Sequence, residues 1–348
     1  MKKVRILSLD GGGIRGIIPG VILAALEKEL KVKSGREDAS ISEYVDLVAG
    51  TSTGGILAGA LLVPDEHDDS KPRYSASEAV NIYLNRGDEI FKTPLWKKVQ
   101  SKAGVTDEKY PAKELEEALS DYFGNTPLSK LLKPVLISSY DIRNANPFFF
   151  KSHKARSDLN YNFELKDVAR ATSAAPTYFE CARVKSFKNE TFALIDGGVF
   201  VNNPSLCAYS EARAMTFGQL KGDDHPKAGE NPTAKDMLII SFGTASSTDY
   251  HSYDEAKDWG MIGWIKPLIG IMMSGVSETV DYQLKQIFDT TDTPDHYIRI
   301  EPDLFDADSS MDNGKPDNLQ RLKESGERNA ERFEDEIKRI AQLLIDNH

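Results

Sequence analysis

Residues 45–57 read Val45-Asp-Leu-Val-Ala-Gly-Thr-Ser-Thr-Gly-Gly-Ile-Leu57, an apolar run that ends in a serine with glycines on both sides. Gly50-x-Ser52-x-Gly54 is the spacing of a nucleophile elbow, in which a strand turns sharply into a helix and holds a serine at the turn. Glycine is needed two positions to either side because side chains there would collide with the strand and the helix. A glycine-rich turn with an incidental serine has the same five-residue pattern, so the rest of the chain decides between the two interpretations.

A second glycine-rich turn, Asp10-Gly-Gly-Gly-Ile-Arg-Gly16, follows an apolar run that predicts a strand over Val4–Leu9. The residues after it, Ile17 to Leu30, have the apolar spacing of a helix. Two strand-to-helix turns on adjacent parallel strands lie at the same edge of a sheet. We therefore expect Ser52 to face this second turn across a crevice.

Three consecutive glycines at this turn expose backbone N–H groups, which suits a site for an oxyanion. We expect Gly11, Gly12 and Gly13 to form the oxyanion hole and Arg15 to bind a substrate phosphate through its guanidinium group. The spacing Gly11-x-Gly13-x-x-Gly16 also matches the dinucleotide-binding fingerprint, so a dinucleotide-binding module is the main alternative. That fingerprint expects an acidic residue about 20 positions later at a strand end. Here the next predicted strand instead enters the serine elbow.

A third informative stretch is Phe192-Ala-Leu-Ile-Asp-Gly-Gly-Val-Phe-Val-Asn-Asn-Pro204. An apolar run delivers Asp196 to a Gly-Gly turn, and an acid at a strand tip is a candidate base for a serine nucleophile. An Asp-Gly turn within a hairpin is the alternative interpretation. A triad through His251 or His296 also remains open, because Ser, Asp and His then follow in the order of one hydrolase class.

Composition narrows the function classes. The chain has 348 residues, with 43 Lys and Arg against 54 Asp and Glu, so its net charge is −11. This balance argues against a nucleic-acid polymer as partner and against strong electrostatic capture by anionic membranes. Cys181 and Cys207 are expected to be free thiols, and no metal or cofactor is expected. Without a signal-peptide pattern or an 18-residue apolar run, we expect a soluble intracellular protein.

The remaining pattern alternates strands and helices, which predicts an α/β fold. Two segments stand apart from that pattern. Residues 316–348 are expected to form a long amphipathic helix, interrupted near Gly326 and packed on the body. Residues 261–273 are apolar but broken by Gly263, Pro267 and Gly270, which fits either a buried helix pair or a lid that contacts lipid.

Taken together, the three motifs resemble those of the patatin-like phospholipases, which have a glycine-rich turn, a serine elbow and an Asp-Gly-Gly turn in this order. Residues 169–179 and 281–300 are similar to the family as well. The resemblance implies a three-layer fold with a mostly parallel central sheet, a patatin-like domain over residues 1–310 and a C-terminal helix over 311–348 packed on it. It also implies a metal-free Ser52–Asp196 dyad without a catalytic histidine, which hydrolyses glycerophospholipid esters as a phospholipase A through an acyl-enzyme.

Stand-alone bacterial members of this size look like intracellular effectors that a cyclic nucleotide activates in antiphage defence. By this resemblance the chain is expected in the cytoplasm, acting peripherally at the inner membrane on phospholipid. The resemblance also leaves open activation by a cyclic nucleotide and assembly into a homo-oligomer.

Overall fold

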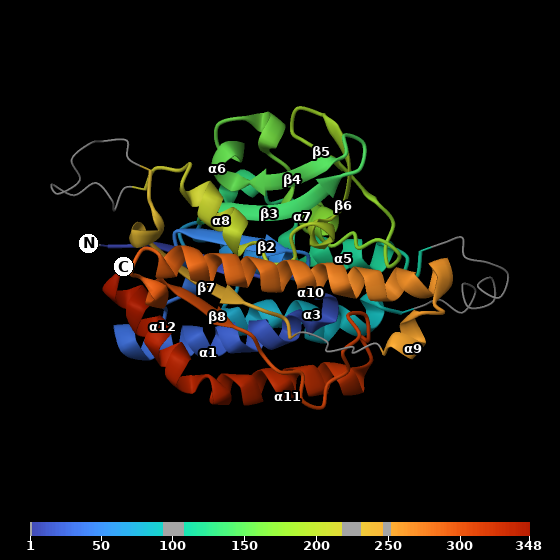
Figure 1. The fold of residues 1–348 in the computed structure, drawn as a ribbon. Coiled ribbons are helices and arrows are strands. Elements are labelled where there is room, and N and C mark those ends of the chain that lie inside the picture. The colour runs from blue at the N-terminus through green and yellow to red at the C-terminus, as the bar shows by residue number, and fades with distance from the viewer. Residues whose placement is uncertain (1, 93–107, 218–230, 246–251) are drawn as a thin grey trace.

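The computed structural model describes residues 2–92, 108–217, 231–245 and 252–348. These residues form one eight-stranded sheet in the order β5-β6-β3-β2-β1-β7-β8, with β4 paired to β3 (Figure 1). The neighbours from β3 through β2, β1 and β7 to β8 are parallel, whereas β4 and β6 run antiparallel to β3. The strands are β1 (Val4–Leu9), β2 (Leu47–Thr51), β3 (Val135–Asp141), β4 (Asn146–Lys151), β5 (Ala182–Lys185), β6 (Thr191–Asp196), β7 (Met237–Phe242) and β8 (Tyr297–Ile300).

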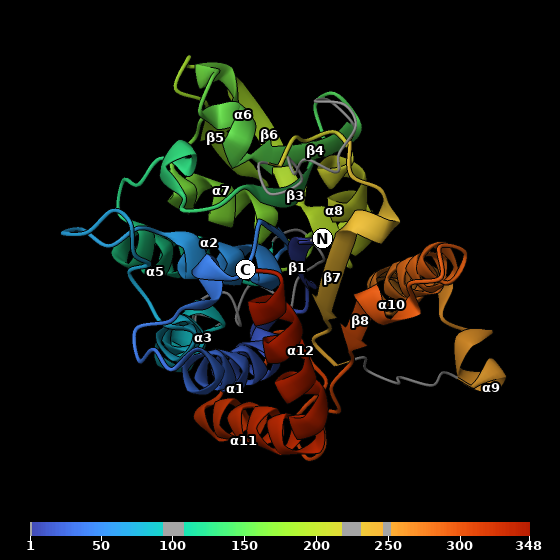
Figure 2. The same ribbon diagram turned by 90° about the vertical axis from the view of Figure 1, so that its left-hand side faces the viewer.

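Helices cover both faces of the sheet, which confirms the predicted α/β class with a mostly parallel central sheet. One face carries α1 (Ile17–Ser34), α2 (Thr53–Leu62), α3 (Ala76–Ile90), α5 (Lys113–Phe123) and α7 (Leu165–Thr172), and the other carries α8 (Ser205–Ala212) and α10 (Gly260–Asp289) (Figure 2). Successive strand residues point to opposite faces, so Leu7 joins the first apolar core and Ile6 the second. Every residue of β1, β2 and β7 is buried, as expected for central parallel strands.

The C-terminal segment packs against α1 as α11 (Pro316–Arg332) and α12 (Glu334–Asp346) (Figure 1). The predicted interruption near Gly326 is wrong, because the break lies at Phe333. Gly326 sits inside α11 and faces Val21 of α1, where a Cβ would lie 2.7 Å from the Val21 Cβ. The glycine therefore lets two helices approach closely and does not end one. The proposed boundary between residues 310 and 311 stays a prediction.

The apolar segment 261–273 forms the first half of α10, a continuous 30-residue helix with Pro267 inside it. The alternative of a buried helix pair is wrong, because several large apolar side chains of this half are 41–50% exposed. Its second half packs on the sheet through Val280, Leu284 and Phe288. A short helix, α9 (Tyr253–Ala256), precedes it. Among the described residues, no helix is long and apolar enough to cross a membrane.

Candidate active site

The serine elbow lies where β2 turns into α2. Ser52 has φ 54° and ψ −122°, a backbone conformation that side chains rarely adopt. A Cβ on Gly54 would lie 2.2 Å from the Leu9 carbonyl oxygen, and one on Gly50 would lie 2.4 Å from the Gly54 carbonyl oxygen. Both glycines are thus required by close backbone packing, for the reason that the sequence pattern indicated. The Ser52 N–H donates to the Thr172 hydroxyl at 2.9 Å, which helps to fix the strained turn.

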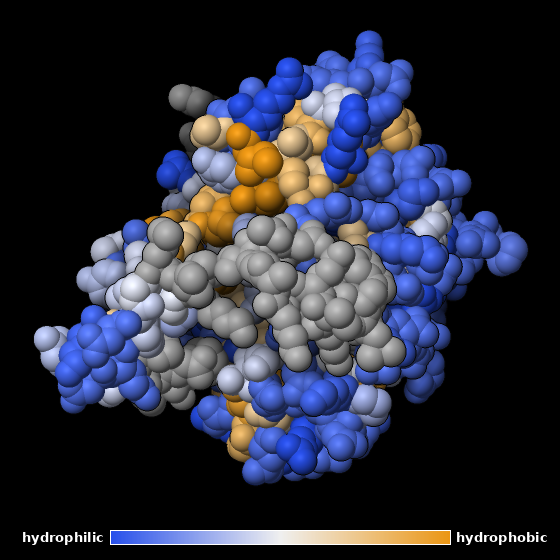
Figure 3. Space-filling view, turned by 90° about the vertical axis from the view of Figure 1, so that its right-hand side faces the viewer, coloured by the Kyte–Doolittle hydropathy of each residue, from blue (hydrophilic) through white to orange (hydrophobic). Residues whose placement is uncertain are grey.

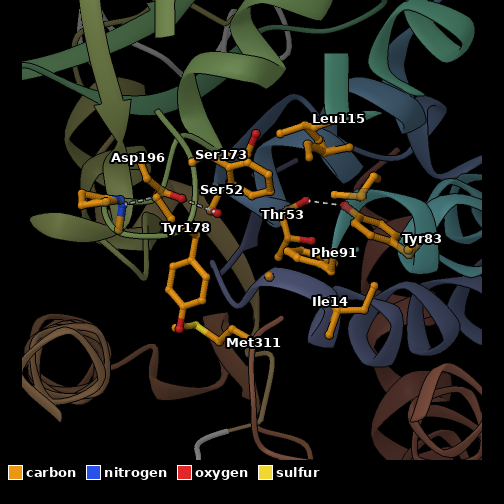
Figure 4. Close-up of a pocket in the computed structure, with 18 of the residues that line it drawn as sticks. Ile14, Ser52, Thr53, Tyr83, Phe91, Leu115, Ser173, Tyr178, Asp196 and Met311 are labelled. Atoms are coloured by element: carbon orange, nitrogen blue, oxygen red, sulfur yellow. Dashed lines mark hydrogen bonds between the residues drawn. The ribbon is translucent and has the colours of Figure 1, made fainter. Parts of the chain in front are cut away.

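Asp196 ends β6 and meets Ser52 directly. The Ser52 hydroxyl donates to Asp196 Oδ2 at 2.6 Å, and the Gly198 N–H donates to Asp196 Oδ1 at 2.7 Å (Figure 4). Although β6 runs antiparallel to β3, its end pairs with Ser139, next to the Ser138 that pairs with Thr51. This register brings the acid level with the elbow. The alternative of an Asp-Gly turn within a hairpin is wrong, because Gly197–Val199 form a short 3₁₀ helix and the next element is the helix α8.

Burial changes the pKa of Asp196. Asp196 is 4% exposed and Ser52 is 7% exposed. Burial raises the pKa of Asp196 to about 7, and the hydrogen bonds from Ser52 and Gly198 only partly oppose this. A carboxylate with a pKa near neutrality is well matched to take a proton from a serine hydroxyl and to return it.

The glycine turn after β1 lies beside the elbow, since a Cβ on Gly11 would lie 3.3 Å from the Ser52 Cβ. Gly11 does not fit the predicted set of three oxyanion donors, because its N–H already donates to the Asn202 carbonyl at 3.1 Å. For the N–H groups of Gly12 and Gly13, no partner is found among the described residues. These two amides are the donors left for an oxyanion, and Gly13 lines the pocket in front of Ser52.

Two side chains hold the peptide planes of this turn. The Thr244 hydroxyl donates to the Gly11 carbonyl at 2.8 Å, and Arg15 Nε donates to the Gly12 carbonyl at 3.4 Å. In a trans peptide the N–H points opposite to the C=O, so fixing these carbonyls directs the next two N–H groups away from Thr244 and Arg15. Arg15 is 7% exposed and is not among the residues that line the pocket. Its position favours support of the turn over the predicted contact with a substrate phosphate.

A buried ion pair anchors the start of the same turn. Arg299 of β8 donates to both carboxylate oxygens of Asp10 at 3.1 and 2.7 Å, and to the Ser241 hydroxyl at 2.7 Å. Burial raises the pKa of Asp10 to about 6, while Arg299 acts to lower it. This pairing was missed from the sequence. The available signal was an arginine in the middle of the otherwise apolar strand Tyr297–Ile300.

An apolar pocket opens in front of the dyad between α3, α5 and α10 (Figure 4). Its volume is about 1060 Å³, open solvent at its mouth included. The lining residues are largely aliphatic and aromatic, among them Ile56, Ile82, Ile90, Phe91, Leu115, Leu119, Tyr178, Phe179, Ile269, Met272, Met273 and Met311. No Lys, Arg or His is among the described residues that line it, so the pocket suits a hydrocarbon chain and does not suit a dinucleotide phosphate.

The histidine alternative loses support from topology. His296 lies in a short helix before β8, whose first residue, Tyr297, pairs with Ile239 near the start of β7. It is therefore at the amino-terminal edge of the parallel strands, whereas Ser52 is at their carboxyl-terminal edge. His251 lies outside the described residues. Among those residues, no cluster of three or more metal-ligating side chains is found.

Comparisons with known proteins point to one family. A family model described as patatin-like phospholipase matches residues 7–208, a span that contains the elbow and Asp196. Patatin-like protein 2 of Oryza sativa subsp. indica is 37% identical over 344 residues, covering 94% of this chain and 84% of that protein. Patatin-like protein 1 of Arabidopsis thaliana is 36% identical over 362 residues, covering 99% and 84%.

A third relative, from Solanum tuberosum, has the name probable inactive patatin-3-Kuras 1. It is 30% identical over 367 residues, covering 99% of this chain and 93% of that protein. Likeness of sequence therefore extends to a protein whose name calls it inactive. Whether the present chain is catalytic therefore depends on the side chains of its own site.

Proposed function

The chain belongs to the patatin-like phospholipase family of lipid acyl hydrolases, and we propose that it cleaves acyl esters of glycerophospholipids through Ser52 and Asp196. The observation that carries the proposal is the 2.6 Å hydrogen bond between these two buried side chains, both of which line an apolar pocket. A serine paired with a base, beside two amides that have no partner among the described residues and a pocket lined by apolar side chains, is equipped for acyl transfer from lipid.

The reaction proceeds in two halves. The Asp196 carboxylate takes the Ser52 proton as Oγ attacks the ester carbonyl carbon, and the resulting oxyanion accepts hydrogen bonds from the Gly12 and Gly13 amides. Collapse breaks the ester bond, and Asp196 gives its proton to the departing lysophospholipid alkoxide. A water molecule then attacks the acyl-enzyme, passes a proton to Asp196, and the fatty acid leaves as Ser52 Oγ recovers a proton.

The test is hydrolysis of phosphatidylcholine by purified variants. We expect Ser52→Ala and Asp196→Asn each to lose at least about 10³-fold in turnover, and the double variant to be hardly worse, because the pair acts as a unit. Ser173→Ala is the matched control, since this pocket serine donates to the Ala169 carbonyl and not to an acid. An active Asp196→Asn together with an inactive His251→Ala or His296→Ala would replace the dyad by a triad.

The family resemblance carries a finer proposal. In it the protein is a cytoplasmic bacterial effector that acts peripherally at the inner membrane, is activated by a cyclic nucleotide, serves antiphage defence and forms a homo-oligomer. The test compares phospholipid hydrolysis with and without added cyclic nucleotides. Activation by one of them is expected, whereas full activity without any nucleotide would contradict this part while leaving the dyad intact.

A further inference from the structure

The first half of α10 presents apolar side chains on its outer face. Trp264, Leu268 and Ile271 are 42%, 48% and 50% exposed, respectively, and their spacing of four and three residues places them on one stripe of the helix. We call these three residues the outer stripe. Isolated exposed apolar residues are common on proteins, but a stripe of large ones on a single helix face is not.

The opposite face of the same helix is already occupied. Val280, Leu284 and Phe288 are buried against the sheet, and Ile269 and Met273 line the pocket. Between Gly260 and Ser277 the sequence contains one charged residue, Lys266. This half of α10 is therefore apolar on both faces, which is typical of a helix that is buried on both sides. The described residues cover one side only.

The outer stripe is continuous with the mouth of the pocket. Met272 belongs to both surfaces, because it lines the pocket and is 41% exposed. Figure 3 looks onto the side of the molecule where α9 and the beginning of α10 lie; most of this side is hydrophilic, and hydrophobic surface gathers mainly in one strip in the upper half of the view. A second copy of the chain bound to the outer stripe would close the pocket, whereas a lipid surface at the same place would supply substrate to it.

We propose that the outer stripe inserts into the surface of a phospholipid bilayer and places the pocket mouth against it. The proposal rests on the proposed function, since a lipid acyl hydrolase has to take its substrate from such a surface. With a net charge of −11, electrostatic attraction to lipid is weak, so apolar insertion has to supply the binding. Trp264 suits the headgroup boundary, where tryptophan is enriched.

Intrinsic weakness of the helix supports this role. A Cβ on Gly270 or on Gly275 would meet nothing within 4 Å, so close packing does not require these glycines. Pro267 removes one hydrogen bond of the helix. The segment can therefore tilt toward a bilayer at low cost while its second half stays anchored on the sheet.

The experiment measures vesicle binding separately from catalysis. Ser52→Ala protein is floated with phosphatidylcholine vesicles, with and without Trp264→Ser, Leu268→Ser and Ile271→Ser together. We expect the triple change to weaken partitioning by roughly 30-fold or more, because three half-exposed apolar side chains no longer leave water. The matched control replaces Val32, Leu159 and Phe187 by Ser. These side chains are 67%, 47% and 41% exposed and lie outside α10, and we expect the control to bind normally.

Two further measurements keep the outcomes distinct. With Ser52 present, the triple variant should hydrolyse a short soluble ester as wild type does but lose activity on vesicles. Equal binding by the triple variant and the parent would overturn the proposal, as would an equal loss in the control. Unchanged binding with a shift from dimer to monomer in sedimentation would assign the stripe to a second copy. If wild type binds vesicles through the outer stripe but hydrolyses no ester, the proposed function is wrong, whereas the proposed membrane-binding role of the outer stripe is kept.

Discussion

Glycine serves opposite purposes in two regions that meet at the same pocket. In the turns around Ser52, added side chains would have no room: a Cβ on Gly12 would lie 2.2 Å from the Thr244 hydroxyl oxygen, and one on Gly54 equally close to the Leu9 carbonyl oxygen. In α10, a Cβ on Gly270 or Gly275 would meet no atom within 4 Å. The turns are therefore built for fixed geometry, which oxyanion stabilisation requires. By contrast, α10 is loosely packed at these two glycines, so this part of the helix can change position more easily than the turns can.

The largest loss of stability should come from adding a methyl group where the structure has no room for one. Gly54→Ala drives a methyl group against the carbonyl oxygens of Leu9 and Asp10, and backbone atoms of two adjacent elements cannot move apart cheaply. We expect the free energy of unfolding to fall by about 3 kcal/mol or more, measured by urea titration. Gly275→Ala is the control and should not destabilise. If the free energy of unfolding of Gly54→Ala were within about 1 kcal/mol of the wild-type value, the contrast between the crowded turns and the open helix would be wrong.

A smaller effect should follow from loosening the turn without crowding it. Thr244→Val keeps the shape of the side chain but removes the hydroxyl that donates to the Gly11 carbonyl. We expect turnover to fall about tenfold with little change in KM, because misdirected amides weaken transition-state binding by roughly one hydrogen bond. Thr244→Ser should retain most of the activity. Equal losses in both variants would mean that Thr244 acts by packing alone.

The smallest effect is expected in α10. Gly270→Ala adds a methyl group in open space and favours the helix, so the free energy of unfolding of this segment should rise by up to about 1 kcal/mol. Hydrogen exchange of the α10 amides should slow, and vesicle hydrolysis should decrease while hydrolysis of a soluble ester does not. Faster exchange in the variant would show that Gly270 is needed for packing, contrary to the comparison.

The sequence predicted the parts of the site that local patterns determine. The strand Val4–Leu9 and its glycine turn follow from an apolar run stopped by small residues, and the structure has the same bounds. Asp196 was a candidate partner of Ser52 because both lie at strand ends, and the family resemblance implied the pair. The direction of β6 was not predicted, since the register of antiparallel strands depends on partners far away in the chain.

Contacts between distant segments account for what was missed. The bond from the Gly11 N–H to Asn202 leaves no local pattern. The arginine in the apolar strand Tyr297–Ile300 is visible in the sequence, but nothing local names Asp10 as its partner, because each contact joins residues more than 180 positions apart. The continuity of α10 was missed for a related reason. Gly263, Pro267 and Gly270 predict a broken segment, but packing of its inner face on the pocket and sheet outweighs these propensities.

The central claim is that Asp196 is the base for Ser52, and the rate at which a fluorophosphonate ester labels Ser52 tests it most directly as a function of pH. Asp196 acts only as a carboxylate, and its pKa is raised to about 7. The labelling rate should therefore be constant above neutrality and fall about tenfold for each unit below it. Asp196→Asn should label at least about 10³-fold more slowly and lose this inflection. Labelling of Asp196→Asn at the wild-type rate, or the same inflection in that variant, would contradict the dyad.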